Sequence, residues 1–402
     1  MKLVQLDAAR GLASIIVVFH HYTLAFASEL RAGARDDLSG NLWGWTINGT
    51  AAVCFFFVLS GFVLTRRYFE TAEHGLLVRG ALKRYPRLHL SCAISILLGV
   101  AVLNTGFEWT AAAADLSGSK WLREFGNAGL PHDPPYSLAA AFRQSVLVLL
   151  VPSNSYFNSN LWTMVFEFWG SLACFALAAI LLFVSRVRLW GAVLLTALIL
   201  FVFTRYYYLV SGGYALNLLG SSMVFGCFVS MLDSRGLRLP PATAIPLLVA
   251  GLIACSQFTI TFDKVGGGLL LLGLLAFRTP PRLLTGRAGV YLGDLSFPLY
   301  LVHTVVLLSV GTLVFVRLDA LGVAGPLLHG ATLAAIFAVS LILCAFVIRV
   351  EGWWVPLVNR VVRRSTYERI RARTGTFLRL LPAGHDTPTA PQDAIRRCRP
   401  TR

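Results

Sequence analysis

The chain has 402 residues, of which 56% are hydrophobic and 13% charged, and its mean hydropathy is +0.69. An ordinary soluble domain carries about 25% charged residues, so this composition excludes that class and predicts a polytopic membrane protein. The formal net charge is +16, yet the arginines lie at the ends of apolar segments and in the C-terminal tail. This distribution follows the positive-inside rule, and we expect no nucleic-acid partner.

Apolar segments of roughly 17 to 25 residues, the length needed to cross a bilayer as a helix, recur along the whole chain. About ten of them are present, and they predict an all-α bundle of transmembrane helices. The segments lie near residues 8–27, 47–65, 88–105, 160–184, 188–204, 214–232, 241–258, 265–278, 289–314 and 327–349. The run at 141–152 is too short to cross comfortably and is interpreted as interfacial or re-entrant.

Arginine clusters between these segments predict the orientation of the bundle. With 141–152 left out, the clusters after the second, fourth, sixth and eighth segments all fall on the same side as Lys2 and the basic tail. That side is predicted to be the cytoplasm, so both termini are expected there. Residues 1–350 would form the transmembrane domain. Residues 351–402 would form a basic cytoplasmic tail, either partly disordered or starting as a helix on the anionic inner leaflet.

The seven cysteines contain no CxxC pair, and six of them lie in apolar segments. They therefore behave as small hydrophobic residues, and neither a metal site nor a disulfide framework is predicted. No small-residue cleavage site follows the first apolar run, so we interpret it as an uncleaved first span.

The first segment carries Arg10 and His21, which need a physical reason inside an apolar run. Eleven positions turn a helix through roughly 1100°, or three turns and about 20°, and advance it by roughly 16 Å. The two side chains therefore share one face, whereas His20 lies about 80° to the side. We favour an anion-binding Arg10 and a base at His21. The alternative is that Arg10 snorkels to the headgroups and the histidines bond to neighbouring helices.

The fourth segment buries a carboxylate, Glu167, which must be neutralised, paired or used. Because the first and fourth segments run in opposite directions and both groups lie in the outer half, we expect Glu167 to orient His21. Trp162 is interpreted as an interfacial anchor that could also line the site.

Three further groups of residues are candidates for binding or lining a site. Ser60, followed by Gly61, forms a small-residue patch that favours close helix packing. Arg84 and Arg87 bracket Pro86 at the start of the third segment, where clustered arginines either bind phosphates or only retain the loop inside. Tyr300 and His303 share a face of the ninth segment and either take part in chemistry or bond across helices.

Together these residues make the chain similar to the membrane-bound acyltransferase 3 family of integral O-acyltransferases. The motifs that carry the resemblance are LDAARGLASIIVVFHHY, FFFVLSGFVL, KRYPRL, LWTMVFEFW and LGDLSFPLYLVH, in family order along most of the chain to about residue 350. The family hallmark of an arginine, ten intervening residues and a histidine fits Arg10 and His21. In two respects the chain departs from its relatives: a proline separates the loop arginines, and only a basic tail follows the last span.

The resemblance implies a multi-pass enzyme of the bacterial cytoplasmic membrane that uses acyl-CoA, with acetyl-CoA as the default donor and no permanently bound cofactor. The acceptor would be a hydroxyl of a surface or lipid-linked carbohydrate. His21 and Glu167 would be catalytic, and Arg10, Arg66, Arg67, Arg84 and Arg87 would hold the CoA phosphates. The alternative is a proton-coupled transporter or flippase in which Arg10, His21 and Glu167 relay protons. The oligomeric state stays open.

Overall fold

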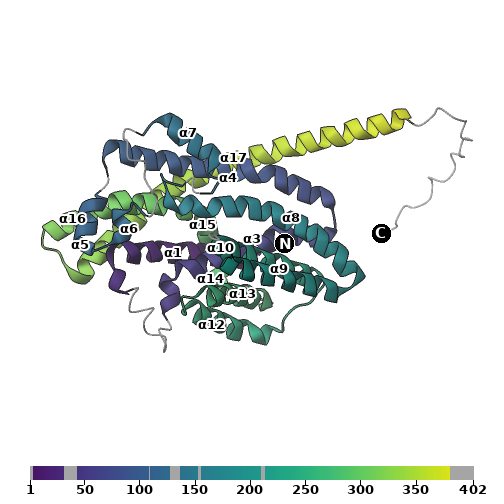
Figure 1. Cartoon of the computed structure of the whole chain (residues 1–402), viewed down its shortest axis with the longest axis horizontal. Helices are drawn as coiled ribbons and strands as arrows, with labels where there is room; N and C mark the ends of the chain where they lie inside the picture. Colours follow the sequence, from purple (N-terminus) through teal and green to yellow (C-terminus); the bar gives the residue numbers. More distant parts are fainter. Residues whose placement is uncertain are drawn as a thin grey trace, which may run out of the picture. The chain divides into compact units, whose positions relative to one another are not determined.

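A computed structural model describes residues 3–30, 43–107, 109–126, 136–152, 155–209 and 213–380, with side chains of the last range described to Arg363. Throughout these ranges the regular elements are helices (Figure 1), so the predicted all-α class is confirmed. Eight helices are long and apolar enough to cross a membrane, which makes the chain a multi-pass membrane protein.

Each predicted apolar segment corresponds to a helix or a continuous run of helices. The eight long ones are α1 (Val4–Phe26), α3 (Gly49–Thr71), α4 (His74–Thr105), η2 with α8 (Ser159–Thr163 and Met164–Val187), α9 (Leu189–Leu209), α10 with η3 and α11 (Gly213–Ala215, Leu216–Gly220 and Ser221–Ser234), α15 with η5 and α16 (Arg287–Val306, Leu307–Gly311 and Thr312–Ala320), and α17 (Gly325–Leu380). The predicted seventh and eighth spans are α12 (Ala244–Cys255), preceded by η4 (Pro241–Thr243), and α13 (Ile260–Ala276). Both are apolar but shorter than the other eight, so the count of ten spans stays a prediction.

Short helices complete the described elements. In the stretch predicted as interfacial or re-entrant, α7 (Leu138–Leu147) has ten residues, too few to cross a bilayer. The helices α5 (Thr110–Ser117) and α6 (Lys120–Arg123) pack against one another, and α5 also packs against α16 at one end of the bundle (Figure 1). The remaining two are η1 (Gly44–Ile47) and α14 (Arg282–Thr285).

The closest packing in the bundle depends on glycines at two helix contacts. A methyl group on Gly11 would lie 2.1 Å from the Leu292 carbonyl oxygen, so only glycine allows α1 to approach α15 this closely. Likewise, a methyl group on Gly61 would lie 2.1 Å from the Met223 carbonyl oxygen of α11. The small-residue patch predicted in the second span therefore brings two backbones together, as such patches do in membranes.

The α1–α15 pair is parallel, because residues that rise in number along one helix meet residues that rise along the other. Asp7 packs on Gly293, and Arg10 bonds to Ser296 further along. The same pairing continues to His21 and His303. The two helices therefore form a common wall that carries an arginine near its N-terminal end and two histidines near its C-terminal end.

The third span differs from the prediction at its N-terminal end. The connection from α3 to α4 is limited to the few residues between Thr71 and His74, and α4 continues for 32 residues. Arg84 and Arg87 consequently lie within the helix, around Pro86, rather than in a loop at its start. A span can begin this early because the polar first turns extend the helix beyond the apolar stretch that hydropathy detects.

Two units divide the chain, Met1–Asn359 and Arg360–Arg402. Helix α17 is unbroken at the predicted domain boundary at residue 350 and is described to Leu380. The predicted disorder of the tail beyond that point lies outside the described residues and stays a prediction.

Candidate functional site

The contacts of His21 determine which of its two ring nitrogens carries the hydrogen in the neutral imidazole. Its Nδ1 lies 3.0 Å from the Val17 carbonyl oxygen and 3.0 Å from Nε2 of His303. A carbonyl oxygen only accepts, so Nδ1 of His21 must carry the hydrogen. In the neutral ring Nε2 then has the lone pair, which is the form that a general base requires.

His303 is completely buried, and its own hydrogen position follows from its neighbours. Its Nδ1 lies 2.8 Å from the Leu299 carbonyl oxygen and therefore donates to it. This leaves Nε2 as an acceptor, and it receives a hydrogen bond of 3.0 Å from the side-chain amide of Asn160. The arrangement agrees with the donor role of His21, since Nε2 of His303 has no hydrogen to offer in return.

Asn160 and Tyr300 connect this histidine pair to η2, the turn of helix that leads into α8. The amide nitrogen of Asn160 has two hydrogens, and the second is used by the Tyr300 carbonyl oxygen at 3.1 Å. The Tyr300 hydroxyl donates to the Asn160 carbonyl oxygen at 2.8 Å and lies 2.6 Å from the hydroxyl of Thr163. Tyr300 and His303 thus bond across helices, the second of the two roles considered for them, and His303 also meets His21.

His20 has a different environment from His21, as the helical arithmetic predicts. Its Nδ1 lies 3.1 Å from the Gly49 amide nitrogen and 3.0 Å from the Ile47 carbonyl oxygen. The ring packs so closely on α3 that a methyl group at Gly49 would lie 2.5 Å from it. His20 therefore holds the start of α3 rather than the histidine pair.

Trp121 and Asn160 belong to the histidine cluster but were not among the predicted site residues. The buried indole of Trp121 on α6 lies 5.4 Å from the His21 ring, with the planes inclined at 31°. Asn160 is the first residue of the predicted fourth segment and follows other polar residues, and nothing local in that stretch indicates its partner. The only available signal was its place seven residues before Glu167, two helical turns along the same segment.

Glu167 has different partners from the one expected for it. Its carboxylate forms an ion pair with Arg84 and accepts a hydrogen bond of 3.0 Å from Ser60. Arg84 also donates to the hydroxyl of Ser171 at 2.9 Å, and both charged side chains are largely buried. The expectation that Glu167 orients His21 is therefore replaced by a pairing with Arg84, while His303 lies against His21.

Arg10 and Arg87 lie in a second charged group that also includes Glu351 of α17. Arg10 donates to the hydroxyl of Ser296 at 3.0 Å. Arg87 has an exposed side chain and interacts electrostatically with Arg10, Arg84, Glu351 and Glu167. Arg10 also lies 3.8 Å from the Asp7 carboxylate, so the three arginines face three carboxylates. The exposed guanidinium of Arg87 is the part of this group that an anion can reach.

The position of Glu351 is held by contacts between α17 and α4. Its carboxylate accepts a hydrogen bond of 2.6 Å from Ser91. One turn further along α17, the indole of Trp354 donates to the Pro86 carbonyl oxygen at 2.6 Å. Sequence reasoning missed Glu351 because it was assigned to the tail, just beyond the last predicted span.

The remaining predicted site residues are Arg66, Arg67 and Trp162, and their described contacts are with residues outside the histidine cluster and the charged group. Arg66 pairs with Glu70 at 3.0 Å and lies 3.8 Å from Asp233. Arg67 is exposed at the end of α3. Trp162 is exposed and packs its ring on Phe166, in keeping with an anchor role.

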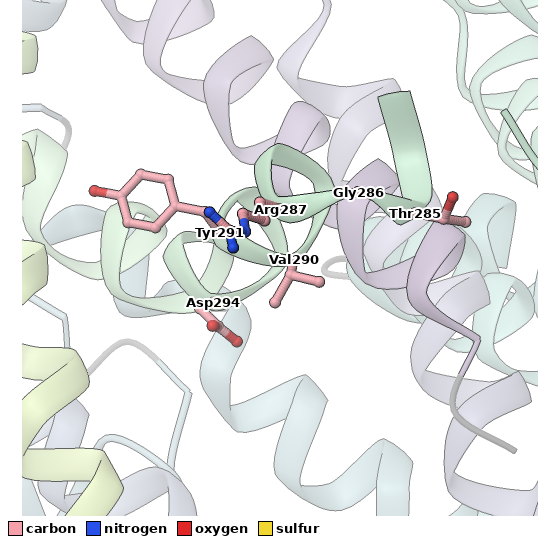
Figure 2. A pocket seen from close by; sticks show the side chains of 6 residues that line it. All are labelled: Thr285, Gly286, Arg287, Val290, Tyr291 and Asp294. Carbon is pink, nitrogen blue, oxygen red and sulfur yellow. The ribbon is translucent and has the colours of Figure 1, made fainter. Parts of the chain in front are cut away.

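An open depression of about 440 Å³ lies at the N-terminal end of α15 (Figure 2). It is lined by Thr285, Gly286, Arg287, Val290, Tyr291 and Asp294. Tyr291 precedes Ser296, the partner of Arg10, by five residues, or about 7.5 Å of helix. The depression offers a cation, a carboxylate and an exposed aromatic ring on the end of the α1–α15 wall that is farthest from the histidines.

No group of three or more histidine, cysteine, aspartate or glutamate side chains suited to a metal ion occurs among the residues that the structure describes. The model of a family described as "Acyltransferase domain" matches residues 3–350. Over 201 residues the chain is 28% identical to "Protein 2 in picA locus" from Rhizobium radiobacter, which covers 48% of this chain and 94% of that protein. No solved structure matches the chain.

Proposed function

This chain belongs to the acyltransferase domain family, and from that premise we propose that it transfers an acyl group from cytoplasmic acyl-CoA to a hydroxyl of an extracytoplasmic or lipid-linked carbohydrate. Acetyl is the first donor group to test. The observation that carries the proposal is the hydrogen position on His21, which leaves Nε2 with the lone pair of a base.

The charged group around Arg10 and Arg87 is the proposed site for the CoA phosphates. Guanidinium groups bind phosphate oxygens in pairs, and Arg87 is exposed while interacting electrostatically with Arg10. Arg84 is already bonded to Glu167 and Ser171, so its proposed role is to neutralise the buried carboxylate and place Arg87. Arg66 and Arg67 are proposed only to attract the donor through their charge.

The depression beside Tyr291 is proposed to receive the nucleotide end of the donor. The depression lies beyond Arg10 at the N-terminal end of the α1–α15 wall, and the pantetheine arm is proposed to run along this wall toward His21. Tyr291 has an exposed ring on which an adenine can stack, and Arg287 supplies a positive charge.

In the proposed reaction, Nε2 of His21 takes the proton of the acceptor hydroxyl as its oxygen attacks the thioester carbonyl carbon. The C–O bond forms, the C–S bond breaks, and the proton passes from the imidazolium to the departing CoA thiolate. In a second route Nε2 of His21 itself attacks the thioester carbonyl carbon, so the N–C bond forms, the C–S bond breaks and the CoA thiolate leaves. The acceptor oxygen then attacks the acyl carbon, the C–N bond breaks, and the hydroxyl proton passes by way of the freed Nε2 to the CoA thiolate. Both routes require the same tautomer.

The proposed location is the bacterial cytoplasmic membrane, with Arg10 toward the cytoplasm and His21 in the outer half. This orientation follows from the arginine distribution and from the parallel α1–α15 wall, which separates the charged group from the histidines by roughly 16 Å of helix.

The test is acyl transfer and acyl-CoA hydrolysis by the purified protein in detergent, comparing His21→Ala with the wild type. We expect the His21→Ala protein to lose transfer while still binding acyl-CoA. His20→Ala is the matched control, and it should retain turnover because His20 contacts Gly49 and Ile47 instead. Wild-type turnover by His21→Ala would refute the proposal. Accumulation of labelled acyl-His21 would identify the second route, and solute movement without acyl transfer would identify a transporter.

A further inference from the structure

We propose that His303, held by Asn160, is a positioning residue that keeps His21 in its base form and stabilises the charge that forms on it. The inference rests on the proposed function, because it assigns His303 a role only if His21 acts as a base or acyl carrier. It assigns to a neutral histidine the place that a carboxylate takes in a serine-hydrolase triad.

The hydrogen-bond directions carry the inference. Leu299 fixes the hydrogen of His303 on Nδ1, and Asn160 points an N–H at its Nε2. The lone pair of this nitrogen is therefore shared by two donors, the side-chain N–H of Asn160 and Nδ1–H of His21, each at 3.0 Å. The other tautomer of His303, with its hydrogen on Nε2, would place an N–H against the donors of Asn160 and His21 and would leave the Leu299 carbonyl oxygen without its donor, so the surroundings allow one tautomer.

The same bond becomes stronger during the reaction. When Nε2 of His21 takes a proton or an acyl group, the ring becomes positively charged, and its Nδ1–H donates a charge-assisted hydrogen bond to His303. Such a charge-assisted bond is stronger than its neutral counterpart, so His303 stabilises the transition state more than the resting state. The difference lowers the barrier of the reaction. The Val17 carbonyl oxygen also accepts from Nδ1 of His21. The stabilisation of the charged ring by Val17 therefore remains when His303 is replaced.

Complete burial of His303 makes its neutral state suitable for this role. The side chain is 0% exposed, and each ring nitrogen has a protein partner in the described structure. A carboxylate at the same place would be an additional buried charge, which is costly in a membrane. An uncharged acceptor supplies the hydrogen bond without that cost.

The experiment compares His303→Leu, which removes the acceptor, with His303→Gln, whose side-chain oxygen can lie near the position of Nε2. We expect His303→Leu to lower kcat roughly 10- to 100-fold with an unchanged KM for acyl-CoA, and His303→Gln to recover a large part of the loss. Asn160→Leu should lower kcat less. Adding it to His303→Leu should cause little further loss, because Asn160 acts through His303.

A spectroscopic measurement separates positioning from packing. In protein labelled with 15N at its histidine rings, the His21 signal, assigned by its loss in His21→Ala, should show Nδ1–H in the wild type. In His303→Leu the chemical shift of this Nδ1–H should move toward that of a weaker hydrogen bond, because only the Val17 carbonyl oxygen still accepts from it. Wild-type kcat in a folded His303→Leu protein, or an unchanged Nδ1–H shift of His21, would overturn the inference. Neither result would affect the proposed function, which fails only if His21→Ala keeps its activity.

Discussion

The buried ion pair between Arg84 and Glu167 allows a quantitative prediction about the stability of the bundle. Their side chains are 9% and 15% exposed, and they also bond to Ser171 and Ser60. Replacing one member leaves the other charge buried without its partner, which costs about 3–5 kcal/mol. Because neither group is fully sealed from solvent, we expect Arg84→Leu to fall at the lower end, about 3 kcal/mol.

The assay is thermal unfolding of the detergent-purified protein, and the expected decrease in Tm is roughly 4 °C for a chain of this length. The double variant Arg84→Leu with Glu167→Leu removes both charges, so it should be more stable than either single variant and approach the wild type. Arg79→Leu on the same helix is the matched control. Its pair with Glu73 is more exposed and should contribute less than about 1 kcal/mol. A double variant as unstable as Arg84→Leu would refute the pairing argument.

Three further outcomes are expected. Arg87→Ala should raise the KM for acyl-CoA roughly 10- to 100-fold in steady-state assays, because a charge-assisted bond to phosphate is lost, whereas Arg67→Ala should change it little. Tyr291→Ala should raise the KM for acyl-CoA but not for acyl-pantetheine, which lacks the nucleotide; equal effects on both donors would contradict the nucleotide site. Gly11→Ala should lower Tm measurably, because its new methyl group would meet the Leu292 carbonyl oxygen at 2.1 Å.

Much of the fold could be predicted from local patterns. Apolar length alone located every described helix that can cross a membrane, because a bilayer requires about 20 apolar residues whatever the neighbouring helices are. The helical repeat alone separated His21 from His20, since angular position on a helix depends only on residue number. The same arithmetic placed Arg10 and His21 on one face, and the structure shows both against α15.

The partners of the buried polar groups could be decided only by the tertiary structure. Glu167 and His21 were expected to meet because both were assigned to the outer half of their spans. Depth restricts which groups can approach, but it does not say which helices are neighbours. The packing of α1 on α15 brings His303, 282 positions away in sequence, to His21, and the early start of α4 brings Arg84 to Glu167. Sequence therefore determined which residues need partners, and packing, through close contacts such as that of Gly11, determined which partners they have.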